Sequence, residues 1–256
     1  MLASETRKHA REALSGKWVK AALIMLVYTL ITWVIKFILN FIPVIGSIVE
    51  LIISIPLSFG LIATLIKLKR DKDTTYIEFF ANGFNNFVSS WKVTLWTALK
   101  LIVPILLVVA SITVMTLAYD PSIFNTHHYT SQFNDVTITT RYVNPIIGIL
   151  SFVAFMLSSI WLFIESYSYK PIFFMLFDNP DIHAKEIVEE SYEIMYGHKW
   201  QWFCLEISFI GWAILALFTC GIGYLWLVPY MIVAEIILYE FLIEEIDETE
   251  NEEPES

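Results

Sequence analysis

Charged residues are scarce in this chain of 256 residues, and their scarcity argues against a soluble domain. They make up 16% of the sequence while hydrophobic residues make up 57%, whereas soluble domains carry about 25% charged residues. Glycine is also rare, with nine residues, and no Walker loop, GxGxxG, HExxH or GxSxG motif occurs. Nothing in the sequence therefore supports an enzyme, and we expect neither catalytic residues nor a cofactor.

Potential metal ligands are few as well. Cys204 and Cys220 lie in apolar runs, and neither takes part in a CxxC or Cys/His pattern. The adjacent His127 and His128 have no further histidine or cysteine near them in the sequence, so we interpret them as ordinary loop residues rather than as ligands. We expect no metal site, and we expect no nucleic-acid partner.

Long apolar runs make up most of what is present. Six segments reach the length of about 20 residues that a bilayer requires, and they cover residues 19–42, 44–68, 93–119, 145–177, 202–219 and 222–243. The first is too long for the apolar part of a signal peptide. The fourth is overlong, so that Pro171 is expected to kink or end it. Short uncharged turns between the first two and the last two segments predict tight hairpins.

Lysine and arginine set the predicted orientation. They gather before the first apolar segment, between the second and third, and between the fourth and fifth, whereas the loop at 120–144 holds only Arg141. We therefore predict a multi-pass protein of the plasma membrane with this loop outside and both the N- and C-termini in the cytoplasm. Residues 136–140 of the loop have the composition of a short strand.

Acidic residues are concentrated at the C-terminus. Eight of them follow Ile243, and they account for most of the net charge of −10. We predict an acidic, disordered cytoplasmic tail over residues 244–256. The tail either keeps the terminus soluble, which we favour, or recruits a basic partner.

The connections on the predicted cytoplasmic side have a helical apolar stripe. In the second connection, Tyr76, Phe80, Phe84, Phe87 and Trp91 recur at helical spacing. Similar connections precede the other hairpins, and each ends in a junction of lysine and tryptophan, which suits the membrane interface.

We therefore predict an all-α polytopic membrane protein with about six transmembrane helices in three hairpins, each preceded by an amphipathic interfacial helix. The repeat-like units cover residues 1–68, 74–177 and 181–243 within a single membrane domain at 1–243. Duplication explains this likeness, and so does convergent composition at the membrane interface.

Charged side chains at membrane depth are costly, and they usually have a partner or a function. Lys36 and Glu50 each lie seven residues from Pro43, so the first hairpin should place them at one depth. We interpret them as a structural ion pair; the alternative is part of a polar pathway.

A second charged group is expected toward the cytoplasmic side. Lys100, Glu206 and Glu235 should lie roughly 9–14 Å from the inner surface at the helical rise, and Glu165 joins them if its helix ends near Pro171. This candidate intramembrane polar cluster either binds a cation, a proton or a polar headgroup, or it only holds helices together.

Several stretches resemble a known family. They are AREALSGKW at 10–18, SYEIMYGHK at 191–199, LEISFIGW at 205–212, and the run from Gly221 through Pro229 to Tyr239. Through them nearly the whole chain resembles the bacterial integral-membrane family called domain of unknown function 975. The resemblance implies a bacterial plasma-membrane protein, but it implies no activity and transfers no functional residues.

Three functional hypotheses follow. The first is a non-enzymatic protein that binds membrane lipids, a protein partner or a second copy of itself through its interfacial helices. The alternative is a transporter or permease component that uses the intramembrane charges. The third, an enzyme acting on lipid headgroups through Glu206 and Glu235, ranks last because no histidine, metal pattern or nucleophile lies beside these carboxylates.

Overall fold

The computed structural model describes residues 2–42, 44–119, 129–133, 136–140 and 145–252. Contacts within the chain separate two compact units, whereas the sequence predicted one membrane domain. Unit 1 comprises Met1–Thr97 and Tyr167–Ser256, and unit 2 comprises Ala98–Ser166. Each unit is described on its own below.

The described residues contain five helices that are long and apolar enough to cross a bilayer, and a bent pair raises the number to six. The five cover Trp18–Leu39, Ile45–Lys69, Ile146–Asp178, Lys199–Phe218 and Tyr224–Ile246, and the pair Phe87–Lys100 and Ile102–Leu117 is bent by 59°. The predicted all-α polytopic membrane fold with about six spans is thereby confirmed.

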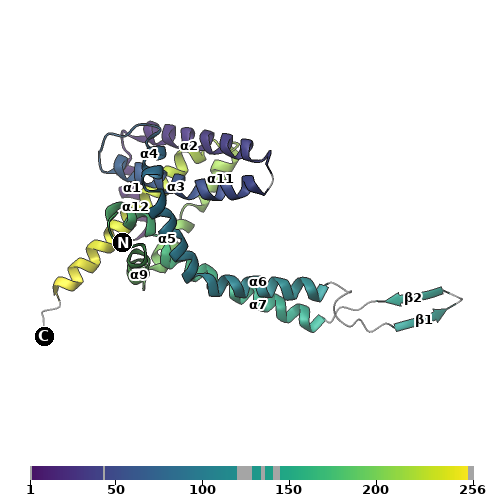
Figure 1. Cartoon of the computed structure of the whole chain (residues 1–256). Coiled ribbons are helices and arrows are strands. Elements are labelled where there is room, and N and C mark those ends of the chain that lie inside the picture. The colour runs from purple at the N-terminus through teal and green to yellow at the C-terminus, as the bar shows by residue number, and fades with distance from the viewer. Residues whose placement is uncertain (1, 43, 120–128, 134–135, 141–144, 253–256) are drawn as a thin grey trace. The chain divides into compact units, whose positions relative to one another are not determined.

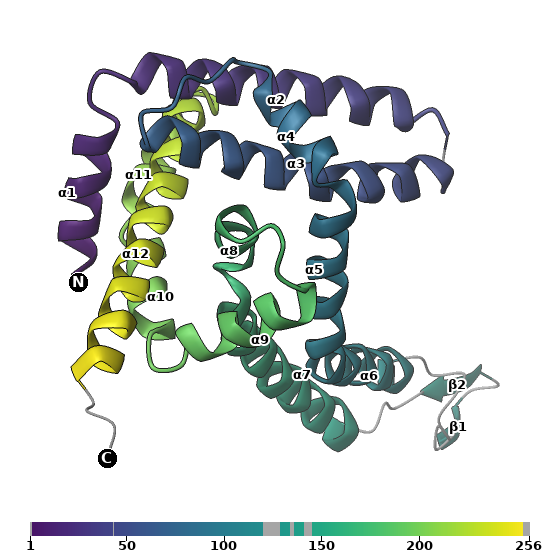
Figure 2. The same cartoon turned by 60° about the vertical axis from the view of Figure 1, so that its left-hand side comes forward.

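A helical hairpin opens unit 1. α2 (Trp18–Leu39) and α3 (Ile45–Lys69) lie side by side (Figures 1 and 2). The turn between them needs a glycine at position 46, because a Cβ on Gly46 would lie 2.0 Å from the carbonyl oxygen of Leu39. Pro56 lies inside α3 without ending it.

The long helix α12 (Tyr224–Glu252) organises the rest of unit 1. It contacts α1 (Ala3–Ala13), α2 and α3, and the short helices α10 (Lys199–Ile207) and α11 (Ile210–Phe218) pack along it (Figure 2). The large buried side chains around it include Trp202, Phe209 and Tyr239. Their burial explains why this helix holds the unit together.

The fourth apolar segment breaks where Pro171 predicts. α7 (Pro145–Ser166) ends before the 3₁₀ turn η1 (Tyr167–Tyr169), and α8 (Ile172–Asp178) begins directly after Pro171. A second break, which the sequence did not predict, separates α10 from α11 at Ser208 and Phe209.

The helices that precede the first and last hairpins have the same local structure. α1 and α9 (Ala184–Ile194) each have 11 residues, and each is followed by a left-handed glycine, Gly16 at φ +75° and Gly197 at φ +85°. The buried positions of the two segments also match. Ala10 and Leu14 are buried, and so are Ser191 and Met195, which lie 181 residues further along the chain.

The helix before the middle hairpin starts in the same way as α1. The N–H of Thr75 donates to Glu78 at the start of α4 (Glu78–Asn85), as the N–H of Leu2 donates to Glu5, at 3.1 Å in both cases. α4 then ends at Asn86 without a left-handed glycine. The first and last repeat-like units thus share the local structure of this helix and the middle unit shares its start, which fits both duplication and convergent composition.

Unit 2 is a second helical hairpin. The end of α5 (Phe87–Lys100) leads into α6 (Ile102–Tyr119), which packs along α7, and the hydroxyls of Ser111 and Ser158 lie 3.5 Å apart between them. The strands β1 (Tyr129–Phe133) and β2 (Val136–Thr140) pair antiparallel. The short strand predicted at 136–140 is therefore present.

The acidic C-terminus differs from the prediction. The sequence predicted a disordered tail from residue 244, but α12 continues to Glu252. Glutamate has a good intrinsic helix propensity, and a helix that already exists extends without a new nucleation step. Residues 253–256 lie outside the described part of the chain.

Candidate functional site

The predicted ion pair of the first hairpin is present in the structure. The Lys36 ammonium on α2 lies 3.0 Å from the Glu50 carboxylate on α3. More than a third of each side chain is exposed, so the pair contributes at most about 1 kcal/mol in water. This geometry fits a structural ion pair, and it does not test whether Lys36 and Glu50 also belong to a polar pathway.

The four residues of the candidate polar cluster are divided between the two units. Glu206 and Glu235 belong to unit 1, whereas Lys100 and Glu165 belong to unit 2. Within unit 1, the structure adds two residues that the sequence analysis had not assigned to the cluster, Tyr167 and Lys170. The tyrosine hydroxyl donates to Glu206 Oε2 at 2.6 Å, and the lysine forms an ion pair with Glu206 Oε1.

The break in the fourth segment explains how these side chains reach Glu206. Tyr167 and Lys170 are three residues apart, and in a 3₁₀ turn such residues lie above one another. The ammonium of Lys170 accordingly lies 5.1 Å from the centre of the tyrosine ring. The carbonyl of Ser168 accepts a hydrogen bond from Ser191 at 2.8 Å, which ties the turn to α9.

Glu235 on α12 is the remaining member of the cluster in unit 1. It is half-buried, and it has no hydrogen-bond or ion-pair partner among the residues that the structure describes. It still lies close enough to Lys170 and Glu206 to interact with both electrostatically. Two carboxylates thus lie near one ammonium, and the ion pair that the structure shows is with Glu206.

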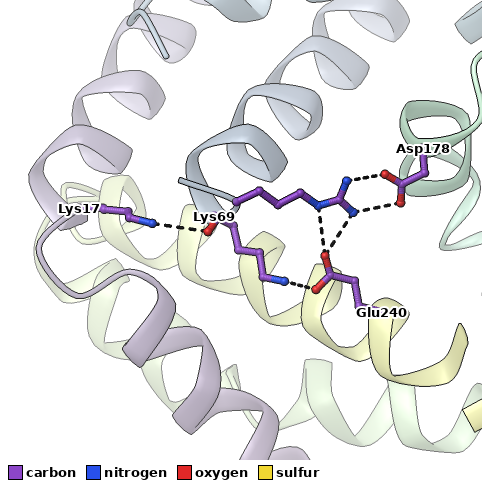
Figure 3. Close-up of polar contacts among 5 residues, drawn as sticks. Lys17, Lys69, Asp178 and Glu240 are labelled. Atoms are coloured by element: carbon purple, nitrogen blue, oxygen red, sulfur yellow. Dashed lines mark hydrogen bonds and ion pairs between the residues drawn. The ribbon is translucent and has the colours of Figure 1, made fainter. Parts of the chain in front are cut away.

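A network of charges that the sequence analysis did not identify joins α3, α8 and α12 at one end of unit 1 (Figure 3). Lys69 and Arg70 both pair with Glu240 on α12, and Arg70 also pairs with Asp178 at the end of α8. Lys17 donates to the carbonyl of Leu68 at 3.0 Å. The hydrogen bond that Arg70 donates to Asp178 raises the pKa of Arg70, against the opposing effect of burial.

A second pair of charges fastens α4 to α3. The ammonium of Lys67 lies 2.6 Å from the Glu78 carboxylate and 2.9 Å from Asn82 Oδ1. Burial acts to raise the pKa of Glu78, but hydrogen bonds from Lys67 and from the N–H of Thr75 outweigh it and leave the pKa below its ordinary value.

One hollow of unit 1 is an aromatic pocket of about 370 Å³. Its lining comes from α1, α2, α11 and α12, and from the turn before α12. The lining residues are Arg11, Trp18, Trp212, Leu215, Ala216, Thr219, Gly223, Trp226, Leu227 and Tyr230. Its volume falls in the range of about 300–1,000 Å³ that ligand pockets occupy.

Small residues close one end of this aromatic pocket. A Cβ on Gly223 would lie 2.8 Å from Ala216 Cα, so α11 and the start of α12 meet backbone to backbone. The hydroxyl of Thr219 accepts the N–H of Gly223 at 2.8 Å, and Tyr224 donates to the carbonyl of Ala213 at 3.1 Å.

Aromatic contacts shape the other end of the pocket. Tyr230 meets Trp18 edge-on at a centroid distance of 5.6 Å and Phe209 at 5.0 Å. Arg11 is the one residue of the lining that carries a formal charge. The sequence analysis missed this pocket, since its residues lie up to 219 positions apart and share no spacing motif.

The fold and these sites define a polytopic helical membrane protein. The sequence profile of the family described as "Protein of unknown function (DUF975)" matches residues 1–245. The chain therefore belongs to this family, as the resemblance implied. No curated protein and no solved structure matches it.

Proposed function

We propose that this protein is a non-enzymatic protein of the bacterial plasma membrane that binds a membrane lipid in its aromatic pocket. The observation that carries the proposal is the pocket itself, where three tryptophans and Tyr230 line a hollow that spans from α1 to the turn before α12. Aromatic and aliphatic linings favour apolar ligands. Lipid acyl chains are the apolar ligands that a membrane supplies.

The outer surface beside the pocket supports entry from the membrane. Trp212 and Leu215 line the pocket, and both also expose more than half of their surface. Exposed apolar side chains on a membrane-spanning helix face lipid tails. An acyl chain therefore reaches the pocket sideways, without crossing a polar layer.

The distribution of lysine and arginine supports an orientation for the proposal. With α1 and both termini on the cytoplasmic side, the Arg11 end of the pocket lies at the inner leaflet. Tryptophan and tyrosine favour this interfacial depth, which fits Trp18 at the start of α2.

The test is to fill the pocket. Leu215→Trp adds bulk to a lining residue, and Leu217→Trp makes the same change on the same helix at an exposed residue outside the lining. Protein purified in mild detergent is analysed for bound lipid by native mass spectrometry. We expect bound lipid to be lost with Leu215→Trp and retained with Leu217→Trp; equal retention in both would remove the proposal and direct the search to a protein partner or a second copy.

A transporter or permease component is the second candidate. The observation in its favour is Glu235, which lies within a candidate span. Its carboxylate has no ion-pair partner among the described residues, and it interacts electrostatically with the Lys170–Glu206 pair. Ionisable residues inside membranes often carry ions or protons. In proteoliposomes, wild type should carry an ion or proton flux and Glu235→Gln should abolish it. A flux that is unchanged in the variant, or no flux in wild type, would exclude this candidate.

A further inference from the structure

Resting on the proposed function, we propose that the bound lipid is an anionic phospholipid whose phosphate group binds Arg11 and Arg7 at the α1 end of the aromatic pocket.

Arg11 lies at the rim of the pocket with its charge uncompensated. It lines the hollow together with Trp18 and Tyr230, and among the described residues it takes part in no hydrogen bond or ion pair of its side chain. A guanidinium beside an apolar hollow matches a ligand that is anionic at one end and apolar at the other, and it binds phosphate oxygens in a bidentate geometry.

Arg7 stands one helical turn before Arg11, so both project from the same face of α1. Its Nη1 donates to the carbonyl of Ser208 at 3.1 Å, a group that the break between α10 and α11 leaves without a helical partner. Its Nε is buried and has no hydrogen-bond partner. A buried donor on a charged group is costly when it is unpaired, and a phosphate that reached Arg7 would pair with it.

Tyr230 brings the two arginines and the pocket together. Its hydroxyl donates to the backbone carbonyl of Arg7 at 3.0 Å, and its ring lines the pocket. Both arginines lie close enough to this hydroxyl to act on it electrostatically.

The acidic residues of α1 do not neutralise these charges. Glu12 pairs with Lys8 at 4.0 Å and with His9 at 3.5 Å, and Glu5 accepts the N–H of Leu2. Arg11 in the pocket lining and Arg7 one turn before it on α1 therefore carry two positive charges without a carboxylate partner in the described part of the chain, which complements a phosphate.

The equivalent place in the last repeat-like unit has a different arrangement of cation and aromatic ring. Arg11 and Trp18 correspond, 181 residues further on, to Tyr192 and Lys199, where the cation and the aromatic ring have exchanged places. There the Lys199 ammonium lies 5.3 Å from the centre of the Tyr192 ring, so the cation is engaged by its own partner. The first unit combines an arginine that has no partner among the described residues with a hollow, which favours a dedicated binding site there.

The experiment compares two lipids that share their acyl chains. Delipidated full-length protein in neutral detergent is titrated with phosphatidylglycerol and with phosphatidylcholine, and the bound fraction is read by native mass spectrometry. Both lipids carry a phosphate, but the choline ammonium offsets its charge in phosphatidylcholine. We therefore expect wild type to prefer phosphatidylglycerol about tenfold and Arg11→Gln to lose most of this preference. Arg11→Lys keeps the charge and should retain part of it.

Lys8→Gln is the matched control, because it removes one positive charge from the exposed side of the same helix. It should leave the preference unchanged. If Lys8→Gln and Arg11→Gln lower the preference equally, or if wild type shows none, the phosphate assignment is overturned while the pocket remains a lipid site.

If Leu215→Trp leaves the binding of both lipids unchanged, the proposed function fails as well. Glycerol phosphate, which lacks acyl chains, should compete poorly, and full competition would identify a free phosphate compound in place of a lipid.

Discussion

At the scale of single residues, the Tyr167–Lys170–Glu206 group shows what keeps a charge at membrane depth. Glu206 accepts from a tyrosine hydroxyl and pairs with an ammonium, so its charge is compensated where desolvation is costly. Glu235 lacks such partners in the described residues, although it faces the same ammonium. The two carboxylates should therefore respond differently to the same substitution.

Glu206→Gln should lower the free energy of unfolding by about 1.5–3 kcal/mol, the usual contribution of a hydrogen bond to a charged group. Glu235→Gln should change it less, because no hydrogen bond or ion pair is lost. Thermal unfolding of both variants in the same detergent measures the difference. A larger loss from Glu235→Gln would show that the unpaired carboxylate, and not the paired one, holds the helices together.

Glu78 gives a residue-scale prediction for pH. Since its pKa is lower in the folded protein than in the unfolded chain, the Lys67–Glu78 pair stabilises the fold at pH values above the ordinary pKa of glutamate, which is about 4.3. This contribution is lost as the pH falls through the folded-state pKa. The difference in melting temperature between wild type and Glu78→Gln should therefore be present at pH 7 and shrink below about pH 4; a difference that does not depend on pH would contradict the role of the charge.

At the scale of elements, α3 and α4 meet without intervening side chains. A Cβ on Gly60 would lie 1.9 Å from the carbonyl oxygen of Phe79, and one on Gly83 would lie 2.3 Å from that of Pro56. The partners are backbone atoms, so neither helix can relieve the clash by rotating a side chain. This close approach places α4 against the hairpin and positions Glu78 for Lys67.

Gly60→Ala should accordingly destabilise unit 1 by roughly 2–4 kcal/mol, because the two helices have to separate. Gly211→Ala is the matched control in α11, where an added Cβ meets nothing within 4 Å. It should be neutral or slightly stabilising, since alanine favours helix over glycine. Melting temperatures of the two variants decide the question, and similar values would show that the contact between α3 and α4 is not tight in the membrane.

The elements that could be predicted from the sequence are those that depend on local features of the chain. Apolar runs predicted the spans, because hydropathy is a property of each segment by itself, and Pro171 predicted the break that it imposes. The break at Ser208 was missed, since no proline or glycine marks it and the Arg7 side chain that satisfies its carbonyl comes from 201 residues away. The aromatic pocket and the Lys170–Glu206 pair were missed for the same reason, because both depend on long-range packing.

At the scale of the whole molecule, the orientation in the membrane links the sequence to the proposed function. Lysine and arginine predict cytoplasmic termini, and the lipid proposal places Arg11 at the inner leaflet on that basis. The prediction can be checked with introduced cysteines in a variant that lacks Cys204 and Cys220.

With Ser131→Cys in the loop that is predicted to lie outside, a membrane-impermeant maleimide added to intact cells should label the new cysteine. A second variant without either native cysteine and with Ser15→Cys, at an exposed position directly after α1, should be labelled only after the cells are opened. The reversed pattern would place α1 and Arg11 at the outer leaflet. The pocket would then bind lipid from the outer leaflet. In a membrane, Arg11→Gln would change lipid binding only if that leaflet contained anionic lipid.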